Sequence, residues 1–306
     1  MSGKEGCSNP VVVVKLGGSV LPTVKAYARV ARFLRHRLRA ASSSPNSAPR
    51  PAGTGERFVA VVSAQNGSTD ALERTARRAA SRSRAAARPS PRALDLLWST
   101  GEIRSVALLT LHLEALGVSA AGLNVHETGL RLAPGSRGLG PEAVLFHGEC
   151  LRAALAAHAV VVVPGFLATD SGETIVSLGR GGSDLTAVLL ARSLGAARCE
   201  LVKDVPGYFS ADPHRDSSAQ HLPALTFSRA LELADAGCDL VQRAAIEAAA
   251  RAALPLIIRS LDARAPVSVV SHTPAAAPAL SHLEFPELCR QPEPAQAGEG
   301  PVFRTV

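Results

Sequence analysis

The sequence predicts an α/β fold with a mainly parallel central sheet, because short aliphatic runs alternate with longer amphipathic segments. The first run, residues 11–14, consists of four consecutive valines, a composition typical of a strand buried on both faces. The second run, residues 58–63, reads FVAVVS. Each run leads directly into a loop of glycines or small polar residues, at the strand end where α/β proteins place their ligands.

The remaining elements continue this alternation. Strands are expected at residues 118–125, 159–163, 199–202 and 255–259. Helices are expected at 23–40, in the arginine-rich stretch after residue 70, and at 94–98, 99–117, 149–158, 185–194, 228–236 and 240–253. Residues 165–178 leave the end of one strand and return to a glycine-rich loop, which indicates a hairpin-like excursion.

Two segments have the composition of chain that does not pack. Residues 41–56 read ASSSPNSAPRPAGTGE, and this run of Pro, Ser and Gly predicts a flexible surface insertion. Residues 271–306 are rich in Pro and Ala and have little periodicity, so we expect a partly disordered C-terminal tail.

Composition excludes several classes of protein. Of the 306 residues, 46% are hydrophobic and 19% charged, and the aliphatic runs are too short to span a bilayer, so we expect a cytoplasmic protein without a membrane partner. Five scattered cysteines without a CxxC pair indicate free thiols and no metal site built by the protein. The net charge of +7 comes largely from arginines on helix faces, and aromatic residues make up only 4%, so nucleic acid is not an expected partner.

One loop carries the strongest chemical signal. Residues 178–187 read LGRGGSDLTA, and several glycines in front of an apolar helix leave backbone N–H groups free to meet an anion. Arg180 lies inside this turn, where a guanidinium can take a carboxylate in bidentate fashion. Ser183 or Asp184 is the expected N-cap of the helix. The loop is therefore predicted to hold a small acid, a phosphate, or both.

The use of lysine is also informative. The chain has only four lysines against 29 arginines, yet Lys15 and Lys203 both stand beside glycine-bearing turns at strand ends. A compact, flexible point charge is what a phosphate site requires at such places.

Six motifs together resemble the aspartate kinases, members of the amino acid kinase superfamily. KLGGSVL, VVSAQNGSTD, STGE, VVPGF, LGRGGSDLTA and KDVPGYFSADPH occur in the order found in that family, and the resemblance runs from about residue 11 to about 270. It implies an amino acid kinase domain over residues 1–270, folded as a three-layer αβα sandwich with a mainly parallel central sheet. It further implies transfer of the γ-phosphoryl group of ATP, with Mg²⁺, to the side-chain carboxylate of L-aspartate, and a homodimer. The paired ACT regulatory domains of feedback-controlled aspartate kinases are not expected in this chain.

The resemblance also assigns roles on the phosphate side. Lys15, with the backbone N–H groups of Gly17, Gly18 and Ser19, would cradle and neutralise the phosphates. Asp184 matches the family residue that orients this lysine, although an aspartate at a helix start is also a plain N-cap.

For the acid, the resemblance implies two opposite charges. Arg180 matches the residue that grips the α-carboxylate, and Glu102 the one that pairs with the α-ammonium group. Thr69 and Ser183 would bond the same ligand. The alternative for Glu102 is a carboxylate placed at the start of a helix, where the helix dipole favours it.

The nucleotide side departs from the family pattern. Nucleotide or phosphate contacts are carried over to Lys203, Asp204, Phe209 and His214. Lys203 stands where the family has threonine, Phe209 where it has tyrosine and His214 where it has arginine, and the family's later phosphate-neutralising lysine falls on Asp239. Lys203 is the hypothesised replacement cation, and a solvent-facing lysine paired with Asp204 is the alternative.

Three functions remain open at this point. The chain is an aspartate kinase whose ATP site has been rebuilt around Lys203, a kinase of the same superfamily that acts on another small carboxylate, or a non-catalytic relative that binds a ligand and regulates a partner. Lys15, Glu102, Arg180 and Asp184 favour the first, whereas Asp239 and His214 favour the last.

Overall fold

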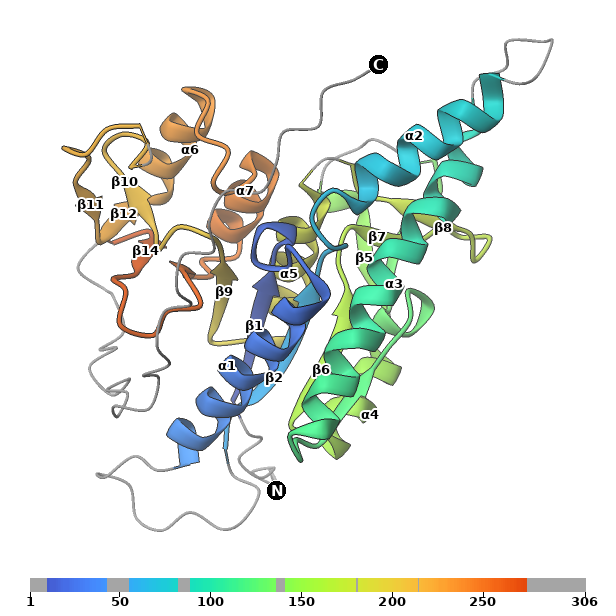
Figure 1. Cartoon of the computed structure of the whole chain (residues 1–306), viewed down its shortest axis with the longest axis horizontal. Helices are drawn as coiled ribbons and strands as arrows, with labels where there is room; N and C mark the ends of the chain where they lie inside the picture. Colours follow the sequence, from blue (N-terminus) through green and yellow to red (C-terminus); the bar gives the residue numbers. More distant parts are fainter. Residues whose placement is uncertain are drawn as a thin grey trace, which may run out of the picture.

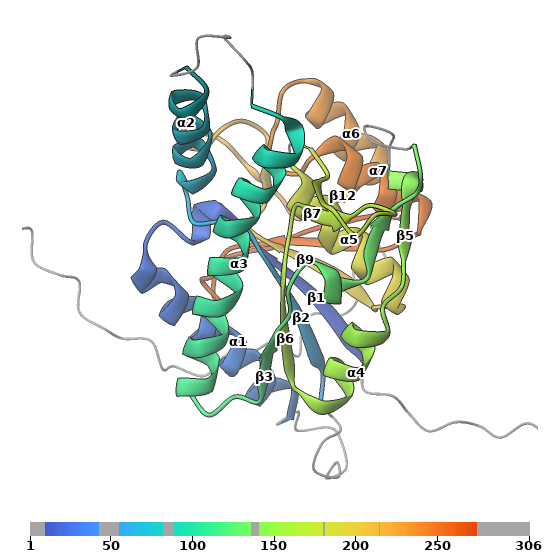
Figure 2. The same cartoon turned by 90° about the vertical axis from the view of Figure 1, so that its right-hand side faces the viewer.

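The fold is an α/β sandwich built on one eight-stranded sheet, seen in a computed structural model of the chain (Figures 1 and 2). The structure describes residues 10–42, 55–81, 89–135, 141–179, 181–213 and 215–273. The strand order is β12-β14-β13-β9-β1-β2-β6-β3, and every neighbouring pair is parallel except β13 with β14. The predicted α/β class with a mainly parallel sheet is confirmed.

The strands are short and apolar. The main sheet contains β1 (Val11–Leu16), β2 (Arg57–Val62), β3 (Ala120–Gly122), β6 (Val160–Pro164), β9 (Arg198–Val202), β12 (Ala224–Thr226), β13 (Leu256–Arg259) and β14 (Ser268–Ser271). A four-stranded sheet contains β4 (Leu130–Leu132), β5 (Val144–Phe146), β7 (Leu167–Thr169) and β8 (Ile175–Ser177), and a two-stranded ribbon contains β10 (Tyr208–Phe209) and β11 (His221–Leu222). The antiparallel pair β7–β8 is the hairpin expected after the VVPGF motif.

Helices cover both faces of the main sheet. They are α1 (Val24–Ser42), α2 (Ser68–Ser81), α3 (Pro91–Ala115), α4 (Glu149–Ala157), α5 (Gly182–Leu194), α6 (Phe227–Asp235) and α7 (Arg243–Arg251). Side chains alternate across β1, so Val12 and Val14 join the core under α1 and α3, whereas Val13 joins the core under α4, α5 and α7. Figure 2 shows these two helical layers on opposite sides of the sheet.

A buried ion network ties the first layer to the sheet. Glu200 on β9 accepts two hydrogen bonds from Arg37 on α1, at 2.6 and 2.7 Å, and one from Arg198 Nε at 2.9 Å, while Arg259 Nη1 on β13 lies 3.5 Å away. Burial would raise the pKa of the Glu200 carboxyl, but the arginines hold it well below its ordinary range. The network therefore fixes α1 against β9, which leads into the candidate site, and against the neighbouring strand β13.

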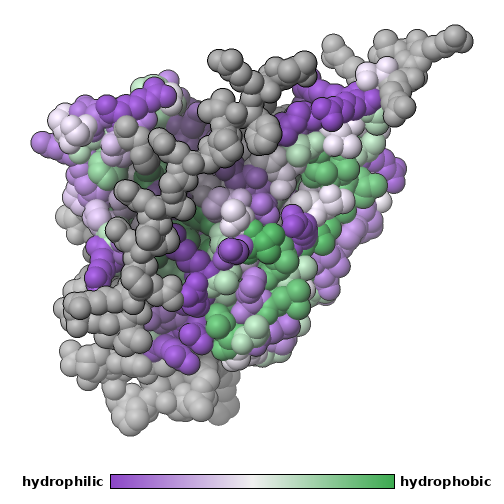
Figure 3. All heavy atoms as spheres, viewed as in Figure 1, coloured by the Kyte–Doolittle hydropathy of each residue, from purple (hydrophilic) through white to green (hydrophobic). Residues whose placement is uncertain are grey.

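The helix α3 differs from its predicted form. Two helices were expected, at 94–98 and 99–117, with the STGE motif as the start of the second, but α3 is continuous from Pro91 to Ala115. Ser99 and Thr100 donate their hydroxyl groups to the carbonyls of Leu96 and Leu97, which satisfies both polar groups inside the helix. Figure 3 shows apolar residues gathered over the outer side of α3, where Leu96, Ile103 and Leu111 are exposed.

Other boundaries also moved. The strand expected at 118–125 is the three-residue β3, and β4, β5, β10, β11, β12 and β14 were not predicted. The expected flexibility of residues 41–56 and 271–306 concerns segments that lie mostly outside the described residues. Within the described ranges, no helix is both long and apolar enough to cross a membrane.

Candidate functional site

The candidate site lies where four neighbouring strands of the main sheet end. β9, β1, β2 and β6 are adjacent and parallel, so the segments after their carboxyl ends meet at one edge. These segments begin with Lys203, Gly17, Ser63 and Gly165, and the amino end of α5 comes from the GRGGSD loop at the same edge. The sequence patterns after each strand thus converge in space, as Figure 1 allows the reader to follow for β1, β9 and α5.

Asp184 holds two lysines at once. Its Oδ1 lies 2.7 Å from Lys15 Nζ, and its Oδ2 lies 2.9 Å from Lys203 Nζ, with all three residues buried. Burial would raise the pKa of Asp184, but the two lysines lower it to about 2. Burial, together with the positive charge of Lys15, lowers the pKa of Lys203. One carboxylate between two ammonium groups leaves one unit of positive charge in this buried cluster.

The alternatives considered for these residues are wrong. The N-cap of α5 is Gly181, in the left-handed conformation with φ 73°, so neither Ser183 nor Asp184 caps the helix. The two residues lie inside its first turn, and the Asp184 carboxylate contacts lysines. Lys203 is 9% exposed and pairs with Asp184, whereas Asp204 is exposed.

The glycines after β1 leave space beside Lys15 and let the loops after β1 and β2 pack closely. A Cβ on Gly17 would lie 3.0 Å from Lys15 Nζ, and a Cβ on Gly18 would lie 3.1 Å from the carbonyl oxygen of Ala64 in the loop after β2. Gly18, Ser19 and Val20 form a short 3₁₀ turn at this place. Side chains at positions 17 and 18 would therefore cover the lysine or push the two loops apart.

Glu102 faces the site from α3. It is 4% exposed, and burial raises the pKa of its carboxyl to about 8, although a hydrogen bond from the Ala64 backbone and the charge of Lys15 act in the opposite direction. Because α3 begins at Pro91, Glu102 is in the helix interior, and the alternative of a carboxylate at a helix start is wrong. Its Oε2 atom is buried and has no hydrogen-bond partner within the part of the chain described.

Other predicted residues are spread around this centre. Ser183 lies against the loop after β6, since a Cβ on Gly165 would fall 2.8 Å from its side chain. Thr69 is half-buried in the first turn of α2. Phe209 on β10 contacts the ring of His221 on β11, with centroids 5.3 Å apart. Arg180 and His214 lie outside the described residues.

Sequence reasoning missed three contributors. The backbone N–H of Gln242, just before α7, lies 3.5 Å from Asp184 Oδ2. Phe166 and Trp98 form an edge-to-face pair with centroids 5.8 Å apart, between the loop after β6 and α3. The available signals were the position of Phe166 two residues after the end of β6 and the position of Trp98 four residues before Glu102.

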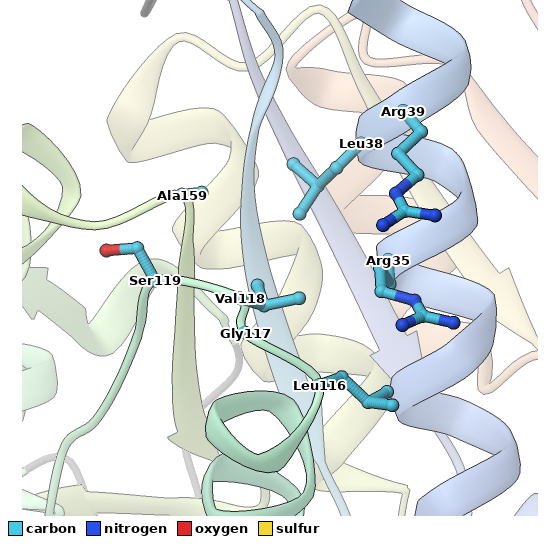
Figure 4. Close-up of a pocket in the computed structure, with 8 residues that line it drawn as sticks. All are labelled: Arg35, Leu38, Arg39, Leu116, Gly117, Val118, Ser119 and Ala159. Carbon is cyan, nitrogen blue, oxygen red and sulfur yellow. The ribbon is translucent and has the colours of Figure 1, made fainter.

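A hollow lies at the opposite edge of the main sheet from the candidate site. It has a volume of about 440 Å³ and lies between α1, the end of α3 and the residue before β6, at the amino ends of the strands. Figure 4 shows Arg35 and Arg39 on α1 beside it, with Leu116, Val118 and Ala159 among the lining residues. None of the predicted site residues that the structure describes lines this hollow.

A buried cluster of one carboxylate and two lysines at the strand ends of an α/β sandwich is suited to binding phosphate groups. The sequence profile of the amino acid kinase family matches residues 10–260, so the chain belongs to that family. Its sequence is 34% identical to the aspartokinase of Thermus thermophilus over 251 residues, which are 82% of this chain and 56% of that protein. The chain thus spans about half the length of the aspartokinases that it matches.

Solved structures agree with this assignment. The fold superposes on the aspartate kinase of Synechocystis with a TM-score of 0.69 and 29% identity, over 86% of this chain and 40% of that one. It superposes on E. coli aspartokinase III in complex with aspartate and ADP with a TM-score of 0.68 and 25% identity, over 86% of this chain and 65% of that one. The resemblance to aspartate kinases, read from six short motifs, is confirmed.

Proposed function

We propose that this protein transfers the γ-phosphoryl group of ATP to the side-chain carboxylate of L-aspartate. The observation that carries the proposal is the buried cluster of Lys15, Asp184 and Lys203 beside Glu102. Two anions must approach each other in this reaction, so a site with surplus positive charge on one side and a receptor for an ammonium group on the other supplies what the reaction needs.

In the proposed reaction a carboxylate oxygen of aspartate attacks the γ-phosphorus. A bond between that oxygen and phosphorus forms, the bond from phosphorus to the bridging oxygen of ADP breaks, and ADP leaves with the electron pair. Lys15 and Lys203 stabilise the charge on the transferred oxygens, and Asp184 keeps the two ammonium groups in place. Gly17 and Gly18 leave room for phosphates next to Lys15.

Binding of the amino acid is assigned to the lobe around Glu102. The buried carboxyl of Glu102 would ionise when the α-ammonium group of the substrate reaches it, and Arg180, Thr69 and Ser183 stay the predicted partners of the α-carboxylate and the rest of the ligand.

Mg²⁺ fits this site as a companion of the nucleotide. Within the described ranges no group of three histidine, cysteine, aspartate or glutamate residues could enclose a metal ion. Beside ATP, Mg²⁺ is usually held by phosphate oxygens and water with one or two carboxylates, so it needs no enclosing cage of protein ligands. When bound, Mg²⁺ neutralises charge on the phosphates.

The test is an assay of ATP consumption over a panel of small acids with hydroxylamine present. An acyl phosphate reacts with hydroxylamine to give a coloured hydroxamate, whereas other phosphorylated products do not. Hydroxamate formed with L-aspartate supports the proposal. Hydroxamate formed only with another acid would favour a kinase of the same superfamily that acts on that acid. Absence of ATP consumption with every acid would favour a non-catalytic relative.

Regulation, assembly and location stay predictions. Feedback inhibition needs a second binding site coupled to the first. The sequence predicts no such site, so activity is expected not to respond to lysine or threonine. A titration with either amino acid tests this, and saturable inhibition not competitive with aspartate would contradict it. Light scattering tests the expected homodimer, and cell fractionation tests the expected cytoplasmic location.

A further inference from the structure

Three buried polar atoms without hydrogen-bond partners lie on the elements around the proposed amino-acid lobe. They are Gln65 Oε1 in the loop after β2, and Trp98 Nε1 and Glu102 Oε2 on α3, each without a hydrogen-bond partner within the described residues. Buried polar groups in folded proteins are almost always paired, so unpaired ones on elements around a proposed binding lobe indicate that a ligand supplies the partners.

Contacts place Trp98 between Glu102 and the start of α5. Trp98 and Glu102 are one turn apart on α3 and therefore share a side of the helix. Glu102 reaches the loop after β2, where it accepts a hydrogen bond from the backbone of Ala64. The ring of Trp98 packs edge to face on Phe166, and a Cβ on Gly182 at the start of α5 would lie 3.1 Å from the Phe166 ring.

The three unpaired atoms have complementary roles. The carboxylate of Glu102 and the amide oxygen of Gln65 accept hydrogen bonds, whereas the indole nitrogen of Trp98 can only donate one. A zwitterionic amino acid carries an ammonium group for the two acceptors and a carboxylate for the donor. A dicarboxylic acid without the ammonium group would leave both acceptors unpaired.

We infer that Trp98 is a specificity-determining residue whose indole N–H donates a hydrogen bond to a carboxylate of the amino-acid substrate. The inference rests on the proposed function and extends it to a residue that simple packing does not explain. If Trp98 served only to pack against Phe166, its indole N–H would stay buried and unpaired. Buried indole N–H groups ordinarily find an acceptor.

Trp98 is the only tryptophan of the chain, so its fluorescence reports on this position alone. Titration of the ATP-free protein with L-aspartate is expected to change the emission in a saturable way, and succinate, which lacks the ammonium group, is expected to need at least a tenfold higher concentration. An emission that L-aspartate does not change would overturn the inference. The hydroxamate assay tests the proposed function separately, since product formation without a change in emission removes only the role of Trp98.

A substitution measures the hydrogen bond itself. Trp98→Phe keeps an aromatic ring against Phe166 and loses the donor, so the KM for L-aspartate is expected to rise about tenfold, with kcat and the KM for ATP within about twofold of the parent values. The matched control is Tyr27→Phe on α1. It removes the hydroxyl group that forms a 2.7 Å hydrogen bond with Ser105 Oγ on α3, the helix of Trp98, and it should leave the KM for aspartate unchanged. An unchanged KM in Trp98→Phe would contradict the inference, and the fluorescence titration decides the matter if the variant does not fold.

Discussion

Lys203→Met removes one of the two ammonium groups that Asp184 holds. The Lys203 Nζ atom lies 2.9 Å from Asp184 Oδ2 and 3.2 Å from Oδ1, while Lys15 keeps its own contact of 2.7 Å. Methionine is similar in length and apolar, so the buried space stays filled and the carboxylate keeps one partner. The cluster then has no net charge, where the parent protein has one surplus positive charge.

The expected loss follows from Coulomb's law. A positive charge about 4 Å from a phosphate oxygen contributes on the order of 4 kcal/mol at an effective dielectric constant of about 20. Removal of one such preorganised donor from an enzyme costs about 3–4 kcal/mol, or roughly a hundredfold to a thousandfold in kcat. We therefore expect kcat of Lys203→Met to fall at least a hundredfold, with little change in the affinity for aspartate.

Steady-state kinetics with ADP release as the readout measure this effect. Lys25→Met, at an exposed position of α1, is the matched lysine control and should keep full activity. Adding Asp239→Lys to Lys203→Met should restore part of kcat, because the exposed Asp239 lies in the turn that leads to Gln242, whose backbone N–H lies 3.5 Å from Asp184. Full activity in Lys203→Met would refute the idea that Lys203 replaces the missing lysine.

Four further predictions use other parts of the structure. Because burial raises the pKa of Glu102 to about 8, L-aspartate binding at pH 7 should release close to one proton, seen by calorimetry in two buffers and lost in Glu102→Gln. That pKa lies above the ordinary value of 4.5, so the ligand-free protein should lose stability as the pH rises from about 5 through about 8, and a thermal midpoint that does not fall there would contradict this. Gly181→Ala should lower kcat at least tenfold, since the added Cβ would meet Gln242 at 1.9 Å, whereas Gly195→Ala at the other end of α5, with open space and a φ of 63°, should cost only about 1 kcal/mol of stability. Glu200→Gln should lower the free energy of unfolding by about 3–5 kcal/mol, measured in denaturant, because it leaves buried arginines without their carboxylate.

Several local signals in the sequence were informative. Four valines followed by Lys-Leu-Gly-Gly predict a buried strand with a tight turn at its end, and the same reasoning places Asp184 at the start of an apolar helix. The expectation that Asp184 lies beside Lys15 came from the resemblance to the aspartate kinases, because these local signals do not say which loops meet.

The partner of Lys203 could not be predicted in this way. Asp204 is next to it in the chain, but successive side chains of an extended segment point to opposite sides, so Lys203 is buried and Asp204 is exposed. Asp184 reaches Lys203 only because β9 lies next to β1 and α5 packs over both strands. This proximity depends on the order of strands in the sheet, which a single sequence does not contain.

The sequence prediction divided α3 into two helices for a related reason. Ser99, Thr100 and Gly101 together resemble a helix boundary, because each disfavours a helix interior. In the fold the two hydroxyl groups bond within the helix, and Gly101 allows Ala64 to approach so closely that an added Cβ would lie 3.1 Å from its side chain. Tertiary packing thus places small residues inside the helix where Glu102 has to meet the loop after β2.

The surplus charge of the cluster gives a physical reason for lysine at positions 15 and 203 in a chain with four lysines against 29 arginines. Asp184 can neutralise only one of its two partners, and burial, with the charge of Lys15, lowers the pKa of Lys203. An ammonium group is a compact point charge on a flexible stem, whereas a guanidinium is a rigid planar fork that suits bidentate contacts. Two ammonium groups fit around Asp184, and an arriving phosphate would restore the charge balance that the protein alone leaves incomplete.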